Sequence, residues 1–170
     1  MRGRAAHPDA RHRKRCLGVR EELCDALRRI AEGGLVRGTE GNASARVGDL
    51  VAISPSGLEY ETLRPEDICL VTLDGELVEG PAPSVELPMH LAVLSARPDV
   101  GAVVHTHSPL ATARPPVPVA IGESGTPELG AAVVEAAAGG DAVVIHGHGP
   151  VCFGRDLAEA VERAFSVEAV

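Results

Sequence analysis

The chain contains very few aromatic residues and almost no lysine. Its 170 residues include two Phe, one Tyr and no Trp, so the predicted core consists of Ala, Val and Leu. Without aromatic side chains there is no platform on which nucleic-acid bases could stack. The only lysine is Lys14, close to the N-terminus. Because Schiff-base enzymes need a desolvated lysine amine, the sequence argues against lysine-dependent aldolases and pyridoxal-phosphate enzymes.

Long apolar runs and paired cysteines are also missing. No run approaches the ~20 apolar residues that cross a bilayer, and the basic N-terminus lacks the apolar stretch of a secretory signal. The cysteines are scattered and form no CxxC pair; they are Cys16, Cys24, Cys69 and Cys152. This pattern predicts reduced thiols in a cytoplasmic protein rather than a disulfide framework.

Positive charge is concentrated at the N-terminus. Six of the 16 Lys and Arg residues lie within residues 1–15, and the rest of the chain carries 10 basic against 23 acidic residues. We therefore expect residues 1–15 to be a disordered basic lead-in and residues 16–170 to form one domain. A net-acidic domain argues against nucleic acid as a partner. A small polar or phosphorylated molecule remains possible, because a metal ion and backbone amides can dominate a pocket.

Apolar spacing and turn residues predict a mixture of helices and strands. Helices are expected over residues 17–32, 85–96, 127–140 and 157–170, with a short helical turn at 65–68. Hairpins are expected from residues 43–47 with 50–54 and from 68–73 with 76–80. Buried strands are expected over 101–107 and 141–149, and residues 113–120 are expected to be a connector. These elements predict an α/β fold in which helices cover both faces of a mixed sheet.

Both predicted buried strands end in a His-x-His pair. The first pair is His105 and His107, and the second is His146 and His148. Side chains at i and i+2 of a strand point to the same side, so both imidazoles of a pair can reach one ion. A single pair of this kind is as often two core histidines with hydrogen-bonded side chains as it is part of a metal site. Two strands that end in the same way favour a metal site.

Glu86 is the candidate fourth metal partner. It follows Ser84, the predicted N-cap of a helix, where a carboxylate also interacts well with the helix dipole, so a capping role is the alternative. His90, one turn later, could orient Glu86 by a hydrogen bond; the alternative is a histidine on the helix surface. The loops at residues 39–44 and 54–57 are small and polar and contain glycine, which suits either anion binding or ordinary turns.

Five motifs in order, GTEGNASAR, ISPSG, PSVELPMH, AVVHTHS and IHGHGPVCFG, resemble the class II aldolase/adducin family from about Cys16 to the C-terminus. The resemblance implies a three-layer α-β-α sandwich with a mixed, largely antiparallel central sheet, and a homotetramer. It also implies one Zn²⁺ ion, with Mn²⁺ or Co²⁺ as alternatives.

The resemblance also assigns roles to individual residues. The implied metal ligands are His105, His107 and His148, not His146, together with Glu86 when substrate is absent. Glu86 is also the implied acid/base. The implied substrate-binding or phosphate-binding residues are Thr39, Gly41, Asn42, Ser56, Gly57 and Ser84.

The chain departs from the family pattern in three places. Val85 stands where members with phosphorylated substrates commonly have a second Ser. The segment between His107 and His148 is shorter and offers no counterpart of the family's catalytic tyrosine, since Tyr60 lies elsewhere. We also expect the C-terminal residues that cover substrate to be missing, as in a shortened member.

Together these observations predict a metal-dependent lyase. It would cleave a C–C bond of a small ketose phosphate or hydroxy-keto substrate through an enediolate. One alternative is a metal-dependent decarboxylase of a keto or aromatic acid. Another is a non-catalytic adducin-like scaffold, in which the metal ligands would be expected to be lost.

Overall fold

One eight-stranded sheet forms the centre of the computed structural model, which describes residues 10–113 and 117–169. The strands within these residues are β1 Asn42–Val47, β2 Leu50–Ile53, β3 Cys69–Thr72, β4 Leu77–Glu79, β5 Ala102–His105, β6 Val119–Ala120, β7 Ala142–Ile145 and β8 Gly149–Gly154. The helices are α1 Ala10–Glu32, α2 Leu87–Ala96, α3 Pro109–Ala113, α4 Pro127–Ala137 and α5 Leu157–Glu168, with 3₁₀ turns η1 Tyr60–Thr62 and η2 Pro65–Asp67.

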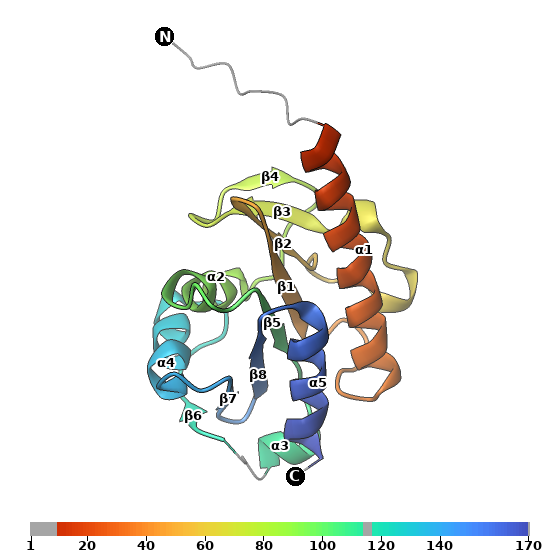
Figure 1. Ribbon diagram of the computed structural model, residues 1–170. Coiled ribbons are helices and arrows are strands. Elements are labelled where there is room, and N and C mark those ends of the chain that lie inside the picture. Colours follow the sequence, from red (N-terminus) through yellow and green to blue (C-terminus); the bar gives the residue numbers. More distant parts are fainter. Residues whose placement is uncertain (1–9, 114–116, 170) are drawn as a thin grey trace.

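The strand order is β4-β3-β2-β1-β5-β8-β7-β6. Neighbouring strands run antiparallel, except that β6 and β7 are parallel. Helices α1 and α5 cover one face of the sheet, and α2 and α4 cover the other (Figure 1). The predicted three-layer α-β-α sandwich with a largely antiparallel sheet is therefore confirmed.

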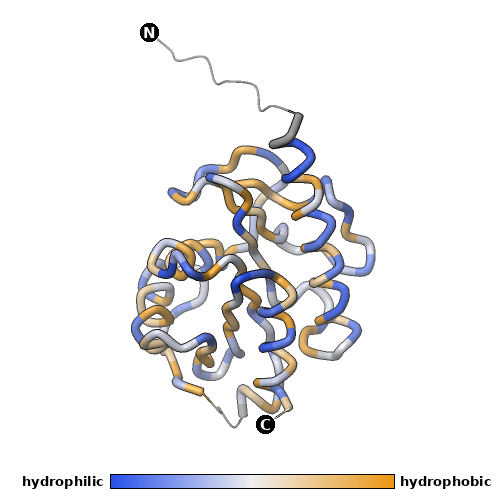
Figure 2. Tube along the Cα trace, in the orientation of Figure 1, coloured by the Kyte–Doolittle hydropathy of each residue, from blue (hydrophilic) through white to orange (hydrophobic). Residues whose placement is uncertain are grey.

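Two apolar cores lie on the two faces of the sheet. Leu23, Leu27 and Ile30 of α1 pack under one face, while Met89 of α2 and Leu129 of α4 pack under the other. Hydrophilic and hydrophobic segments alternate along α1 and α5, as expected for helices with one buried face (Figure 2). Each fully buried aliphatic side chain contributes roughly 1.5–3 kcal/mol, so small aliphatic residues can hold the layers together without many aromatic rings.

Two helix starts differ from the prediction. Helix α1 begins at Ala10, so residues 10–15 of the expected disordered lead-in are helical, and residues 1–9 lie outside the described residues. Helix α2 begins at Leu87 with Glu86 at its N-cap, not Ser84. The reason is Pro88: proline lacks an N–H and fits only in the first turn, which fixes the start of α2 just before it.

The expected second buried strand, residues 141–149, is wrong at its C-terminal end. Strand β7 ends at Ile145, and residues 146–148 form a turn from which β8 returns antiparallel, with Ile145 opposite Gly149. Strand β8 was not predicted, because its Gly and Pro residues are typical of turns. It lies between β7 and β5, so the two strands that carry the His-x-His pairs are not neighbours.

Most of the remaining elements follow the prediction with small shifts, but the short helix α3 and the 3₁₀ turn η1 were not predicted. Strand β5 ends at His105 rather than at residue 107, and β6 lies inside the expected connector at residues 113–120. The four cysteines are all buried and free. Within the described residues, no helix combines the length and the apolar character needed to span a membrane.

Candidate metal centre and active site

His105 and His107 lie where the central strand β5 ends. His105 is fully buried and sits opposite Asn42 of the neighbouring strand β1. Its Nδ1 lies 2.9 Å from the carbonyl oxygen of Pro150. Since a carbonyl can only accept, Nδ1 carries the proton and Nε2 presents a lone pair. Hydrogen bonding of one ring nitrogen to the backbone is the usual way in which a metal-binding histidine is oriented.

His148 reaches the same point from the turn between β7 and β8. Gly147 in this turn has φ +67°, a left-handed conformation that suits glycine. At Gly149 a Cβ would collide with the backbone oxygen of Thr106, so the turn can sit against the end of β5 only with glycine there. The Nε2 atom of His148 is 2.8 Å from Nε2 of His107 and 3.3 Å from Nε2 of His105.

These distances fit a bound metal ion. One ligand atom from each of Glu86, His105, His107 and His148 lies within 4.8 Å of the other three. Tetrahedral zinc with bonds of about 2.0–2.1 Å holds its nitrogen ligands about 3.3 Å apart. Unprotonated imidazole nitrogens repel one another at such distances unless a cation or a proton lies between them. The donor set of three imidazoles and one carboxylate therefore suits a divalent transition metal. The exposed His146 lies outside this cluster.

Burial prepares the imidazoles for metal binding. Desolvation lowers the pKa of His105 to about 3 against the opposing charge of Glu86, and it also lowers the pKa of His107. Both rings are therefore neutral at pH 7. Neutral imidazole is the form that ligates metals, so no proton has to be removed from these two residues first.

Glu86 is held at both carboxylate oxygens. Its Oε2 accepts a hydrogen bond from Nδ2 of Asn42 at 2.8 Å and lies 3.2 Å from Nε2 of His105. Its Oε1 accepts a hydrogen bond from the hydroxyl of Ser124 at 2.7 Å. Burial alone would raise the pKa of Glu86, but the charge of His105 when that ring is protonated and the hydrogen bonds from Asn42 and Ser124 outweigh burial and lower the pKa. Glu86 is thus a buried but ionised carboxylate at neutral pH.

His90 is not a surface residue. It is fully buried in α2, with Nδ1 2.7 Å from the hydroxyl of Ser44 and Nε2 2.5 Å from Oδ1 of Asn42. Its link to Glu86 therefore runs through Asn42 rather than by direct contact. Desolvation lowers the pKa of His90 to about 4, against the opposing effect of Glu86.

The loop residues singled out in the sequence gather beside the metal cluster. They line a cavity of about 180 Å³. Its lining includes all six implied substrate-binding residues, Thr39, Gly41, Asn42, Ser56, Gly57 and Ser84, together with Val85, Glu86, His107 and His148. Tyr60 supports this cavity from outside, because its hydroxyl donates to the carbonyl oxygens of Glu40 and Gly41.

Two residues of the site were missed by the sequence analysis. Ser124 lines the cavity and bonds to Glu86, yet it sits in a Gly-containing stretch that reads as an ordinary loop. Glu40, within the GTEGN motif, lies 3.7 Å from Nδ1 of His107 through its carboxylate. Its place between Thr39 and Gly41 was the available signal. The expected N-cap residue Ser84 instead accepts a hydrogen bond from the backbone N–H of Glu86 at 3.3 Å.

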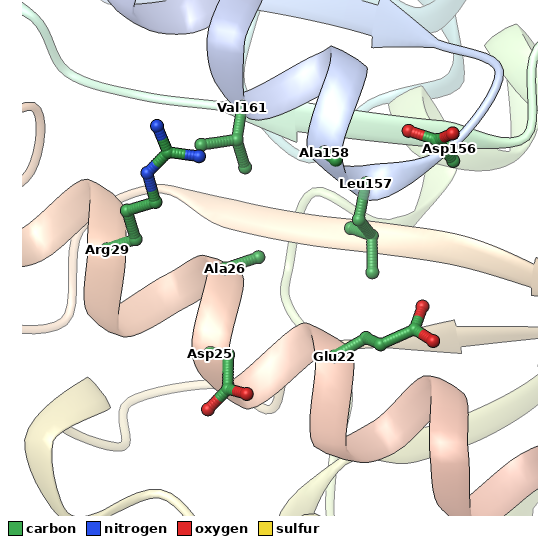
Figure 3. A pocket seen from close by; sticks show the side chains of 8 residues that line it. All are labelled: Glu22, Asp25, Ala26, Arg29, Asp156, Leu157, Ala158 and Val161. Carbon is green, nitrogen blue, oxygen red and sulfur yellow. The ribbon is translucent and has the colours of Figure 1, made fainter.

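A larger hollow of about 570 Å³ lies between α1 and α5 (Figure 3). Glu22 and Asp25 of α1 and Asp156 before α5 give it acidic walls, and Leu157 and Val161 give it an apolar side. It contains no histidine or cysteine and shares no lining residue with the cavity beside the metal cluster. The chemistry of the residues, rather than cavity size, identifies the smaller cavity as the candidate active site.

Comparison with known families agrees with this geometry. The family described as "Class II Aldolase and Adducin N-terminal domain" matches residues 21–115 and 113–170. The chain belongs to this family. The family predicted from the sequence motifs is thus confirmed, and its class II members are metal-dependent, in line with the Glu/His cluster.

Several relatives of this class II aldolase-family chain are named aldolases. It is 37% identical, over an alignment of 172 residues, to the 5-methylthioribulose-1-phosphate/5-deoxyribulose-1-phosphate aldolase of Rhodospirillum rubrum. This alignment covers 89% of this chain and 78% of the relative. It is 50% identical over 95 residues to the 5-deoxy-D-ribulose 1-phosphate aldolase of Bacillus thuringiensis serovar kurstaki, covering 54% of this chain and 45% of the relative.

A solved structure of an L-fuculose 1-phosphate aldolase superposes with a TM-score of 0.83 at 32% identity, covering 89% of this chain and 82% of that chain. These relatives are consistent with the predicted class, an aldolase-like lyase.

Proposed function

We propose that this chain is a zinc-dependent aldolase that cleaves a ketose 1-phosphate between C3 and C4. The observation that carries the proposal is the convergence of three imidazoles and the ionised Glu86 beside a small polar cavity. Relatives named for 5-deoxypentulose 1-phosphates support this substrate class. His105, His107 and His148 would hold the ion, with Glu86 as a further ligand before substrate enters. The ion, when bound, stabilises negative charge on the substrate oxygens as the C–C bond breaks.

Glu86 moves the proton in this proposal. It is ionised at pH 7, so it can accept the proton that the C4 hydroxyl loses as the C3–C4 bond breaks and return a proton to C3. Asn42 and Ser124 hold one carboxylate oxygen each, which limits the carboxylate to small movements. Such fixed geometry contributes to rate because the reacting groups do not have to find each other.

The polar loops would bind the phosphate group. Thr39, Ser56 and Ser84 offer hydroxyls to the cavity, and Gly41 and Gly57, with φ of +72° and +70°, let the backbone approach an anion closely. Val85 lines the same cavity and is 69% exposed, so it offers an apolar wall in place of a hydroxyl.

The test is a direct assay of the protein loaded separately with Zn²⁺, Mn²⁺ or Co²⁺. With 5-deoxyribulose 1-phosphate we expect release of dihydroxyacetone phosphate and acetaldehyde. This release can be monitored as the oxidation of NADH by a coupling enzyme that reduces one of the two products. Glu86→Gln should retain metal and lose turnover by a factor of at least about 10², the usual range for a general acid/base. Normal turnover by Glu86→Gln would contradict its assigned role.

The runner-up is a metal-dependent decarboxylase of a keto acid. The observation that favours it is Val85, which removes a phosphate donor from the cavity. Release of CO₂ from a β-keto acid, with no cleavage of any ketose phosphate, would replace the aldolase proposal. The cytoplasmic location and the homotetramer remain predictions, and sedimentation of the purified protein tests the second.

A further inference from the structure

We propose that His90 is a positioning residue for Glu86 and that it acts by fixing the orientation of the Asn42 side chain. This inference rests on the proposed function, in which Glu86 transfers the proton. The supporting observation is a buried chain of polar groups that runs from Ser44 through His90 and Asn42 to Glu86. Its three contacts measure 2.7, 2.5 and 2.8 Å, and the four residues are at most 4% exposed.

Only one distribution of protons satisfies all three contacts with a neutral ring. The Glu86 carboxylate can only accept, so Asn42 must turn its NH₂ group toward Oε2. This leaves Oδ1 of Asn42, which can also only accept, facing His90. His90 must therefore carry its proton on Nε2, and its Nδ1 then accepts from the Ser44 hydroxyl. Desolvation lowers the pKa of His90 to about 4, so the ring is neutral as this chain requires.

Strand pairing and helix packing set the positions of the partners. Asn42 and Ser44 are two residues apart on β1, so both side chains face α2. His90 lies one helical turn after Glu86 on α2. The backbone thus fixes where Asn42 stands, and the orientation of its amide is left to its two partners.

Glu86 and His90 together hold that orientation, one at each end of the amide. If the Asn42 amide were flipped, its oxygen would face the Glu86 carboxylate and its NH₂ group would face the Nε2–H of His90. Both contacts would then be repulsive, and each would leave a buried polar group unpaired. With His90 donating to Oδ1, the NH₂ group of Asn42 is held toward Oε2 of Glu86. Without His90, Oδ1 loses its donor and only the carboxylate opposes rotation of the amide, so this anchor of Glu86 is weakened.

The first test needs no turnover. The ring nitrogens of His90 can be observed by ¹⁵N NMR in the metal-free wild-type protein between pH 6 and 8. We expect a protonated Nε2 and an unprotonated Nδ1 over this whole range. A ring protonated on Nδ1, or a doubly protonated ring at pH 7, would overturn the proposal. This test stays decisive even if the protein proves not to be an aldolase.

The second test separates positioning from folding. In His90→Leu we expect kcat to fall about 10–100-fold, as is usual when a hydrogen-bonding partner of a site residue is lost, with KM changed less than about threefold and metal content unchanged. In His90→Gln the side-chain NH₂ can stand near the position of Nε2 and donate to Asn42, so most of kcat should return.

Asp156→Ala is the matched control for stability. Asp156 caps α5 by accepting from the backbone N–H of Glu159 at 2.9 Å and makes no contact with the metal cluster. This variant should lower Tm and leave kcat unchanged. The proposal is wrong if His90→Leu keeps wild-type kcat or if His90→Gln loses as much as His90→Leu. If the wild-type protein cleaves no substrate, the proposed function fails and the NMR result alone decides the role of His90.

Discussion

Acid should destabilise the metal-free protein through His90. The ring is buried and neutral in the folded state, and its pKa falls from 6.5 to about 4 on folding. Between these values the unfolded chain binds a proton that the folded chain does not, so stability rises with pH across this window. The contribution is fully present above pH 6.5 and is lost as the pH falls toward 4. A pKa change of this size corresponds to about 3 kcal/mol of unfolding free energy.

The measurement is urea unfolding of the metal-free protein at several pH values from 7.5 to 4.5. Wild type and His90→Leu should differ in slope by up to about 1.4 kcal/mol per pH unit below pH 6.5, because one titrating group has been removed. His105 is also buried and neutral, but it is present in both proteins and cancels from the comparison. Leaving Asn42 without a donor also destabilises His90→Leu, but this cost does not depend on pH. It therefore lowers the unfolding free energy equally at every pH and leaves the slope unchanged. Equal slopes for the two proteins would refute the reasoning.

Two further substitutions test the histidine cluster and the turn that carries His148. His148→Ala should lower metal content after dialysis to near zero by elemental analysis, whereas His146→Ala, which removes an exposed ring outside the cluster, should retain metal; equal metal loss in both variants would contradict the ligand set. Gly149→Ala should destabilise the protein by about 1–3 kcal/mol in urea unfolding because its Cβ meets the backbone oxygen of Thr106. The control is Gly18→Ala, inside α1 with open space around it, which should instead be neutral or slightly stabilising. If the Gly149→Ala protein were as stable as wild type, the turn could move to accommodate the added Cβ and the reasoning would be wrong.

The sequence was sufficient to predict most of the fold because its patterns are local. Alternating apolar residues and Gly-containing turns predicted the hairpins β1–β2 and β3–β4, and helical spacing predicted α1, α2, α4 and α5. Strand β8 was missed because Gly149, Pro150 and Gly154 are read as turn residues. Pro150 is tolerated there because its carbonyl, rather than a missing N–H, makes the contacts to His105 and to the backbone of Thr106.

The site could be predicted only where its residues carry a recognisable spacing. The His-x-His pairs and the small polar loops indicated where the chemistry lies, and the structure brings those residues together with the exception of His146. The environment of His90 could not be predicted, because a histidine on an amphipathic helix gives no sign of which face it occupies. Ser124 carries no signal at all, since its contact with Glu86 depends on the conformation of the loop between β6 and α4.

Because β8 lies between β5 and β7, the relative positions of the metal ligands do not depend on the length of the chain segment that joins them. His148 is brought to His105 and His107 by pairing of β8 with β5, not by the residues that run between them. Helix α3, strand β6 and helix α4 lie between β5 and β7 along the chain, with β6 at the edge of the sheet. Changes in the length of the loops around β6 can therefore alter the rim of the cavity while the three imidazoles stay in place.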